Sequence, residues 1–157
     1  MSTSRKCNNK LNFSWITDRL AFGSGFSGPA DISVLVNVGI THIMDVEIND
    51  DRPYMKNFPQ VVYAYNGIED DHKDKPIEYW KNVIEFSLGA LSRPNTKVYI
   101  HCAAGVSRSA GAVYTVLRAM GIKADDTLAL IQKYRPQAHP EFWTQWAEFA
   151  LKKLGYV

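Results

Sequence analysis

The sequence lacks the features that mark secreted disulfide-rich proteins and membrane proteins. Its 157 residues contain two cysteines, Cys7 and Cys102, too few for a disulfide framework. No apolar run approaches the length of a membrane span, and the polar first ten residues lack the apolar core of a signal peptide. We therefore expect a cytoplasmic protein in a reducing compartment, with no membrane partner and with Cys7 as an incidental thiol.

An excess of charge of one sign is also missing. The chain carries 18 Lys and Arg residues against 16 Asp and Glu residues, a formal net charge of +2. This balance gives no bulk electrostatic attraction to nucleic acid, so we expect no such partner. The length and the 46% hydrophobic content suit a single globular domain. We favour a monomer.

One stretch contains a cysteine and an arginine in an arrangement that suits catalysis. Residues 101–111 read His-Cys-Ala-Ala-Gly-Val-Ser-Arg-Ser-Ala-Gly, between an apolar strand-like run and a long apolar helix-like run. This order places the Cys102 thiol in a loop of small residues at a helix N-terminus, where backbone N–H groups and the helix dipole attract anions and favour the thiolate. Arg108 adds a planar fork of donors that suits two phosphate oxygens. We therefore predict a cysteine nucleophile directed at a phosphoryl group.

Other interpretations of this stretch fit less well. A Walker-type phosphate loop would need Gly-Lys-Ser/Thr, which is missing. A rhodanese-like sulfur transferase also uses a loop cysteine, but Arg108 and the Ser-Arg-Ser ending favour phosphate. The remaining alternative is a buried structural cysteine beside a surface arginine.

The stretch resembles the signature loop of the cysteine-dependent protein tyrosine phosphatases, most closely their dual-specificity branch. The residues that carry this resemblance are His101, Cys102, Gly105, Ser107, Arg108 and Ser109. The resemblance covers residues 13–150 and includes residues 20–24, residues 39–43 and the pair Arg135-Pro136. It implies hydrolysis of phosphotyrosine, and also of phosphoserine and phosphothreonine, in a phosphorylated protein partner.

A general acid must protonate the leaving oxygen of a phosphate monoester, and an acidic loop at residues 69–74 can supply it. The loop follows a predicted strand, as the signature loop does, so the two can meet at one sheet edge. The resemblance assigns the acid to Asp70, and Asp71 is the alternative. We expect a raised pKa for Asp70 and a structural place near a helix N-terminus for Asp74.

The other residues of the signature stretch receive supporting roles. We expect His101 to organise the loop behind Cys102 without transferring protons. Ser109 can donate a hydrogen bond to the sulfur or cap the following helix. No metal or cofactor is expected, because Arg108, the loop amides and the helix end supply the positive charge. The predicted phosphate-binding set is Ala103, Ala104, Gly105, Val106, Ser107, Arg108 and Ser109.

Hydrophobic periodicity predicts an α/β fold. Short strands are expected within residues 13–23 and at 41–46, 61–65 and 97–100, with an irregular loop at 49–59. Helices are expected at residues 29–38, 76–91, 109–120 and 125–134, and from residue 140 onward. The aromatic residues of the last two helices are expected to face the core, as a stripe at helical spacing: Tyr134, Phe142, Trp143, Trp146 and Phe149. We therefore predict a single domain over residues 13–157 after a flexible tail at residues 1–12, and the family resemblance implies that this domain is protein tyrosine phosphatase-like. Its central, mostly parallel mixed sheet has about five strands, with helices on both faces.

Two further hypotheses about function stay open. The chain could be a catalytically silent phosphate-binding pseudophosphatase, although it retains a cysteine, an arginine and an acid. It could also act on a phosphorylated glycan, lipid or RNA. The uncharged interior of the loop, Ala103, Ala104, Val106 and Ser107, disfavours a highly charged head group.

Overall fold

The computed structural model describes residues 11–157. The tail predicted over residues 1–12 therefore lies outside the described residues apart from its last two, and so does Cys7. Each helix in the described part is too short or too polar to cross a lipid bilayer.

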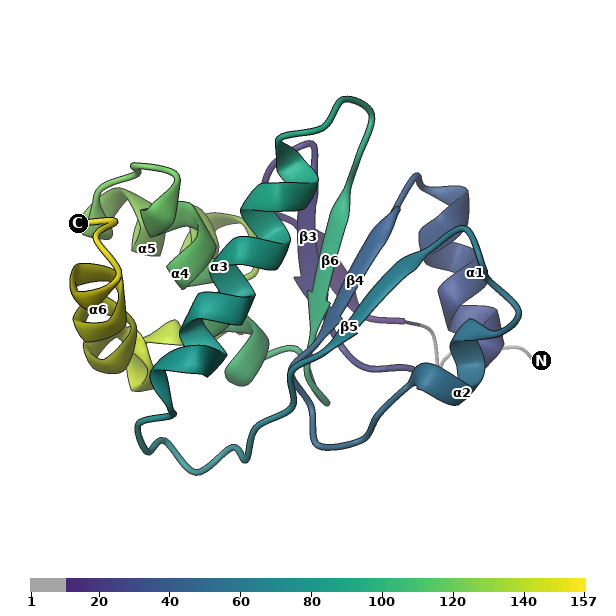
Figure 1. Ribbon diagram of the computed structural model, residues 1–157, viewed down its shortest axis with the longest axis horizontal. Helices are drawn as coiled ribbons and strands as arrows, with labels where there is room; N and C mark the ends of the chain where they lie inside the picture. Colours follow the sequence, from purple (N-terminus) through teal and green to yellow (C-terminus); the bar gives the residue numbers. More distant parts are fainter. Residues whose placement is uncertain (1–10) are drawn as a thin grey trace.

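A five-stranded mixed sheet forms the centre of the described chain, with the order β2-β3-β6-β4-β5 (Figure 1). Its strands are β2 (Phe13–Trp15), β3 (Leu20–Gly23), β4 (His42–Asp45), β5 (Val62–Tyr65) and β6 (Val98–His101). Only the edge strand β2 pairs antiparallel, with β3, and the other neighbours are parallel. The prediction of a mostly parallel mixed sheet is confirmed.

Helices cover both faces of this sheet, as predicted (Figure 1). The helices are α1 (Pro29–Asn37), α2 (Arg52–Met55), α3 (Ile77–Leu91), α4 (Arg108–Ala119), α5 (Ala124–Tyr134) and α6 (Thr144–Lys153), with a short 3-10 turn η1 (Pro140–Phe142) before α6. Helices α1 and α2 lie on one face. Helices α3 to α6 and η1 lie on the other, where α4 is central.

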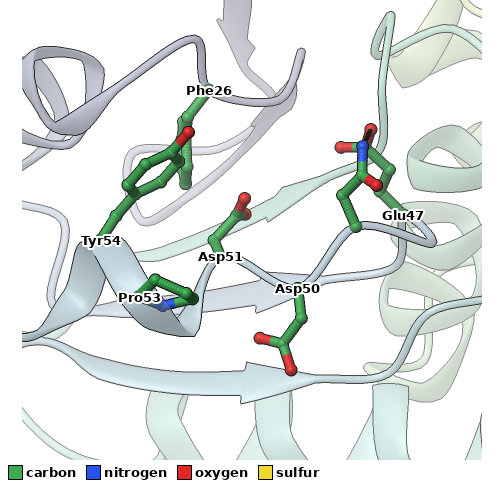
Figure 2. A pocket seen from close by; sticks show the side chains of 7 residues that line it. Phe26, Glu47, Asp50, Asp51, Pro53 and Tyr54 are labelled. Carbon is green, nitrogen blue, oxygen red and sulfur yellow. Dashed lines mark hydrogen bonds between the residues drawn. The ribbon is translucent and has the colours of Figure 1, made fainter.

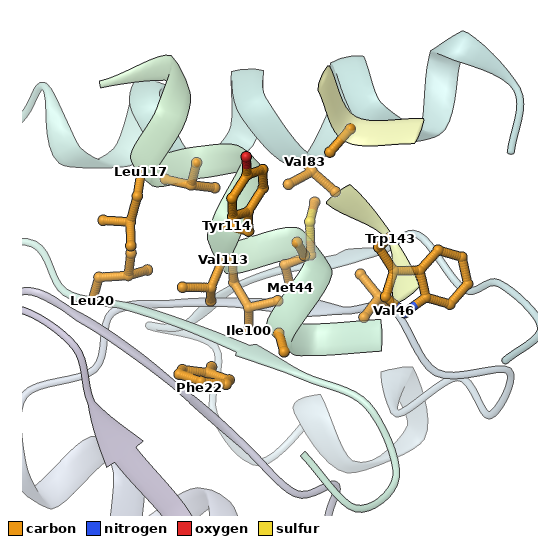
Figure 3. Close-up of a cluster of buried hydrophobic side chains, with 14 of the residues drawn as sticks. Leu20, Phe22, Met44, Val46, Val83, Ile100, Val113, Tyr114, Leu117 and Trp143 are labelled. Atoms are coloured by element: carbon orange, nitrogen blue, oxygen red, sulfur yellow. The ribbon is translucent and has the colours of Figure 1, made fainter. Parts of the chain in front are cut away.

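Alternation along the strands divides the apolar core into two layers. Ile43 and Tyr99 face α1 and α2, whereas their neighbours Met44 and Ile100 face α3 and α4. Figure 3 shows the larger layer, in which strand side chains meet α3, α4 and Trp143. Strands β3, β4 and β6 are fully buried, as expected for parallel strands covered on both faces.

Some local predictions were wrong in detail. The segment 49–59 was expected to be a loop, but it contains α2, which begins at Arg52 with Pro53 in its first turn. The helix expected from residue 140 begins as η1 and continues as α6 after a break. Tyr134, Phe142 and Phe149 were expected to face the core, but all three are exposed. Their helical spacing fits the apolar stripe, but within residues 11–157 no further layer of structure covers them.

The parallel strands bring three segments to one edge of the sheet. The signature loop follows β6, residues 46–51 follow β4, and the acidic loop follows β5. This edge, at the carboxyl ends of the strands, is where open α/β sheets place their ligands.

Candidate active site

The carbonyl groups of the signature loop are each held from outside the loop. His101 Nδ1 lies 3.1 Å from the Cys102 carbonyl oxygen, and Gly25 N–H donates to the Ala103 carbonyl at 2.9 Å. Arg135 donates to the carbonyls of Ala104 and Gly105, at 3.4 and 2.7 Å. The Val106 carbonyl accepts from His139 N–H at 2.6 Å. Each carbonyl group from residue 102 to residue 106 is therefore held by a hydrogen bond from the surrounding protein.

The N–H groups of the same loop are free for a ligand. In a trans peptide the carbonyl of one residue and the N–H of the next point in opposite directions. Holding the carbonyls of residues 102–106 outward therefore aims the N–H groups of residues 103–107 into the loop. Within residues 11–157 these five N–H groups donate to no protein acceptor. Successive inward N–H groups at the start of α4 form an anion-binding nest.

Gly105 is the one loop position that its surroundings restrict to glycine. Its φ of +71° is in the left-handed region, which side chains disfavour. A Cβ atom there would also lie 2.3 Å from the Gly23 carbonyl carbon, which cannot move aside because it belongs to β3. The loop therefore packs directly on the backbone that follows β3.

Cys102 lies at the floor of this nest. Its side chain is 2% exposed, and its Sγ lies 3.2 Å from Ser109 Oγ. Ser109 is in the first turn of α4, whose N-cap is Ser107 without a side-chain cap bond. The capping role considered for Ser109 is therefore absent, and its hydroxyl faces the sulfur.

Arg108 donates one hydrogen bond to the residue just before the acidic loop and has a second donor without a partner within residues 11–157. Its Nη1 donates to the Ile68 carbonyl at 3.0 Å. Its Nε is buried and meets no acceptor in the part of the chain that the structure describes. A buried unpaired donor costs about 1–3 kcal/mol, which an acceptor bound in the nest would offset.

The acidic loop reaches the signature loop through Asp70. Ser107 Oγ donates to Asp70 Oδ1 at 2.9 Å and accepts from Trp143 Nε1 at the same distance. Asp71 instead turns away, to Lys75 Nζ at 2.6 Å. The hydrogen bonds from the Lys75 side chain and the Lys73 N–H lower the pKa of Asp71. Asp74 accepts from the Lys75 N–H at 2.7 Å, just before α3.

Aromatic side chains hold the acidic loop in place. His72 has a φ of +58° and stacks on Phe142, with ring centroids 4.1 Å apart. Its carbonyl accepts a hydrogen bond from Trp146 Nε1 at 3.2 Å. The segment from Pro140 to Trp146 thus supports the acidic loop, a role that the sequence prediction of a core stripe did not include.

Behind Cys102, His101 is fully buried among acidic residues. Its Nε2 lies 2.7 Å from Asp51 Oδ2 and 3.8 Å from Asp45 Oδ1, and its Nδ1 lies 4.0 Å from Glu47 Oε2. Burial lowers the pKa of His101, but Asp51 and Asp45 outweigh it, so the pKa lies above its ordinary value. Burial also raises the pKa of Asp45 to about 7, against the opposing effects of His101 and Tyr63.

This acidic cluster does not fit a metal ion. Asp45, Glu47 and His101 place ligand atoms within 4.8 Å of one another. A metal-binding imidazole must offer the lone pair of one nitrogen. Both ring nitrogens of His101 already face an oxygen, of Asp51 and of the Cys102 carbonyl.

Sequence reasoning missed three residues that shape the site. Arg135, 1% exposed, was noted at a helix end and as part of the family resemblance without a role in the site, and Trp143 only as a core residue. Asp51 was in a segment expected to be an irregular loop. No local pattern marks them, because each acts across a long separation in the chain.

Comparisons with known proteins identify the family to which the chain belongs. The family described as "Dual specificity phosphatase, catalytic domain" matches residues 27–152. Tyrosine-protein phosphatase vhp-1 of Caenorhabditis elegans is 33% identical over 113 residues, which are 71% of this chain and 16% of that protein. Serine/threonine/tyrosine-interacting protein B of Xenopus laevis is 35% identical over 107 residues, 66% of this chain and 48% of that protein. The chain thus spans half or less of these relatives' length.

A solved structure shares the fold along nearly its whole length. The human tyrosine phosphatase-like serine/threonine/tyrosine-interacting protein superposes with a TM-score of 0.74 at 30% identity. The match covers 91% of this chain and 98% of that one.

Proposed function

The chain belongs to the dual-specificity phosphatase family, and we propose that it hydrolyses phosphate monoesters on proteins through a phosphocysteine intermediate on Cys102. Residues 13–157 form the catalytic domain in this proposal. Phosphotyrosine is the principal substrate, with phosphoserine and phosphothreonine in addition. The family match and the relatives named as phosphatases support a protein phosphatase.

In the first step the Cys102 thiolate attacks phosphorus in line with the leaving oxygen. The N–H groups of residues 103–107 and the Arg108 guanidinium bind the three remaining oxygens, on which negative charge gathers. The sulfur–phosphorus bond forms as the bond from phosphorus to the ester oxygen breaks. Asp70 donates its proton to that oxygen, so the product leaves as an alcohol or phenol.

In the second step water attacks the phosphorus of the thiophosphate. Asp70, now ionised, accepts a proton from this water, and the sulfur leaves as a thiolate. Ser109 Oγ lies 3.2 Å from the sulfur. When the sulfur departs as a thiolate, which can only accept, the Ser109 hydroxyl donates a hydrogen bond to it and makes it a better leaving group. Inorganic phosphate is released and Asp70 is protonated again, so the cycle closes.

The observation that carries this proposal is the contact between the two loops. Ser107 binds Asp70, and Arg108 binds the Ile68 carbonyl, so the acid stands beside the nest that holds the sulfur. The unpaired loop amides and the unpaired Arg108 Nε are donors that still need an acceptor. A phosphoryl group supplies it.

The neutral loop interior supports a singly phosphorylated side chain as the substrate. Ala103 and Ala104 are exposed and carry no charge, so they offer nothing to the extra phosphates of an inositol lipid. They also leave the nest open to solvent, which suits access by both long phosphotyrosine and short phosphoserine side chains.

A pseudophosphatase is the second candidate. The solved relative is described as a tyrosine phosphatase-like, interacting protein, and for this chain the corresponding proposal is phosphate binding without hydrolysis. Against this role, the chain retains a nucleophile, a phosphate-binding arginine and an acid in contact with their loop.

Hydrolysis of para-nitrophenyl phosphate in the presence of EDTA tests the proposal. The wild-type protein is expected to turn over this ester, and Cys102→Ser is expected to abolish turnover while the fold remains. If the wild type binds phosphate but does not turn over the ester, the pseudophosphatase is the correct reading. Turnover that Cys102→Ser leaves undiminished would exclude the cysteine mechanism.

A further inference from the structure

Both ring nitrogens of His101 lie close to an oxygen atom of the surrounding protein. Nδ1 lies 3.1 Å from the Cys102 carbonyl, which is an acceptor only. Nε2 lies 2.7 Å from Asp51 Oδ2, in a carboxylate that is 5% exposed, and the pair is an ion-pair contact whose angle departs from that of a regular hydrogen bond. A neutral imidazole has one N–H and would turn a lone pair towards one of these oxygens. The imidazolium, with an N–H on each nitrogen and a positive charge beside the Asp51 carboxylate, fits both contacts.

We infer that Asp51 is a positioning residue that holds His101 as an imidazolium and so fixes the peptide between Cys102 and Ala103. The protonated Nδ1 donates to the Cys102 carbonyl and holds it outward. Because the C=O and N–H of one peptide unit point in opposite directions, the Ala103 N–H is then aimed at the bound anion. The inference rests on the proposed role of the loop as the site of an anion.

The other four inward amides do not depend on a titrating group in this way. Their carbonyl partners receive hydrogen bonds from the Gly25 N–H, the His139 N–H and the Arg135 guanidinium, which keep their protons. Only the first peptide of the nest is held by an imidazole. Loss of the His101 proton would therefore release one end of the nest and leave the rest in place.

The groups around His101 define which charges act on its proton. Asp51 and Glu47 come from the segment after β4, and Asp45 ends β4 itself. Phe26, from the segment between β3 and α1, lies over the ring with centroids 4.5 Å apart. Tyr99 of β6 stacks at 5.9 Å, and burial keeps its phenol protonated by raising its pKa. The Cys102 thiol completes the surroundings.

Asp51 is the carboxylate that decides the charge state, because it is the nearest to the ring. Asp45 lies further from the ring than Asp51, and its Oδ2 already accepts a hydrogen bond from the Tyr63 hydroxyl at 2.8 Å. Figure 2 shows that Asp51 and its neighbour Asp50 point in opposite directions. Asp51 lines a pocket of about 300 Å³ with Phe26, Glu47 and Tyr54. Asp50 is exposed and provides a matched control.

The rates at which two reagents alkylate Cys102 measure anion binding by the loop, and this assay does not require turnover of a substrate. Iodoacetate carries a carboxylate that the nest attracts, whereas neutral iodoacetamide reports the thiolate alone. The ratio of the two rates therefore reports anion binding, independent of the Cys102 pKa. A titration of the His101 ring by NMR supplies the protonation state over the same range of pH.

In the wild type, the ratio is expected to fall as pH rises through the titration of His101. Asp51→Asn is expected to lower the midpoint of the rate ratio and the midpoint of the His101 titration together, by about one pH unit. The reason is that removal of an opposite charge at this distance lowers the pKa of the imidazolium by about one unit or more. Asp51→Glu is expected to restore both midpoints to their wild-type pH, and Asp50→Asn is expected to change neither midpoint. These readouts stay valid if the phosphatase assay fails, so the two proposals fail separately.

Two results would overturn the inference. One is a ratio that does not follow the His101 titration in the wild type, a test that holds even if Asp51→Asn does not fold. The other is a folded Asp51→Asn variant, verified by circular dichroism, in which His101 titrates at the wild-type pH.

Discussion

Ser107 Oγ donates a hydrogen bond of 2.9 Å to Asp70 Oδ1, and this contact joins the acidic loop to the loop that carries Cys102. Asp71, the residue after Asp70, forms an ion pair with Lys75 instead. The pKa of Asp71 is lowered, which disfavours the protonated form that a general acid needs. The two adjacent aspartates therefore differ in their surroundings, and this difference supports our proposal that Asp70 is the general acid.

We predict different effects for the two aspartates. Asp70→Asn is expected to lower kcat for an aryl phosphate with a poor leaving group by on the order of 10²–10⁴-fold, because the leaving oxygen is no longer protonated. Asp71→Asn removes only an exposed ion pair and is expected to change kcat by no more than about twofold. Steady-state kinetics on both variants decide the matter. A slow Asp71→Asn beside a fast Asp70→Asn would reverse the assignment.

Trp143 is expected to act on catalysis through Ser107. Trp143→Phe removes the Nε1–H that donates to Ser107 Oγ, so the hydroxyl that holds Asp70 loses its orientation. We expect kcat to fall several-fold and the free energy of unfolding to fall by about 1–3 kcal/mol, from the lost hydrogen bond and volume.

Trp80→Phe is the control for that variant. Trp80 is equally buried, but its Nε1 has no partner within residues 11–157. A similar loss of stability with an unchanged kcat is expected. Equal losses of kcat in the two variants would mean that the Trp143 hydrogen bond has no catalytic role.

Gly105→Ala is expected to distort the nest. The added Cβ meets the backbone at Gly23, and the positive φ strains any side chain. We expect a loss of about 1–3 kcal/mol in stability and a larger loss in affinity for inorganic phosphate, measured by calorimetry.

Gly89→Ala tests whether that effect is specific. Gly89 is in α3, and nothing lies within 4 Å of the position that its Cβ would take. This variant is expected to gain about 0.5–1 kcal/mol in stability and to bind phosphate like the wild type. Unchanged phosphate binding in Gly105→Ala would contradict the tight packing of the loop.

Glu148 is expected to make stability depend on pH. Hydrogen bonds from Arg118, at 2.6 and 2.8 Å, lower the pKa of Glu148, and Tyr114 donates to the same carboxylate. A carboxyl group whose folded pKa is depressed stabilises the fold above its unfolded pKa of about 4.3, and this contribution is lost as pH falls through the folded pKa.

Urea unfolding at several pH values checks this dependence. Glu148→Gln is expected to be less stable than the wild type at pH 7, and the difference is expected to shrink towards pH 3. Glu85→Gln, at an exposed position of α3, is expected to show no such convergence. A difference that stays constant with pH would assign the effect of Glu148 to packing alone.

The sequence suffices for the parts of the site that are local or periodic. Cys102 and Arg108 belong to one short motif between a strand and a helix, so both their chemistry and their placement follow from the order of residues. The strands and the long helices follow from apolar periodicity. The meeting of two loops at one edge follows from parallel strands.

Contacts across long separations could not be predicted in this way. Arg135 binds carbonyls some thirty positions earlier in the chain, and Asp51 binds His101 from a segment with two prolines and no periodicity. Whether an aromatic residue such as Phe149 faces the core depends on a further layer that periodicity does not report. These features depend on tertiary packing, and only the fold reveals them.

Trapping of the covalent intermediate tests the central claim most directly. With para-nitrophenyl phosphate the leaving group needs little protonation, so Asp70→Asn is expected to form the phosphocysteine but to hydrolyse it slowly, for want of a base. Rapid acid quenching and mass spectrometry of the peptide that contains Cys102 are then expected to show the mass of one added phosphoryl group, absent from Cys102→Ser. Turnover of the ester with no phosphoryl group on Cys102 at any time point would contradict the account.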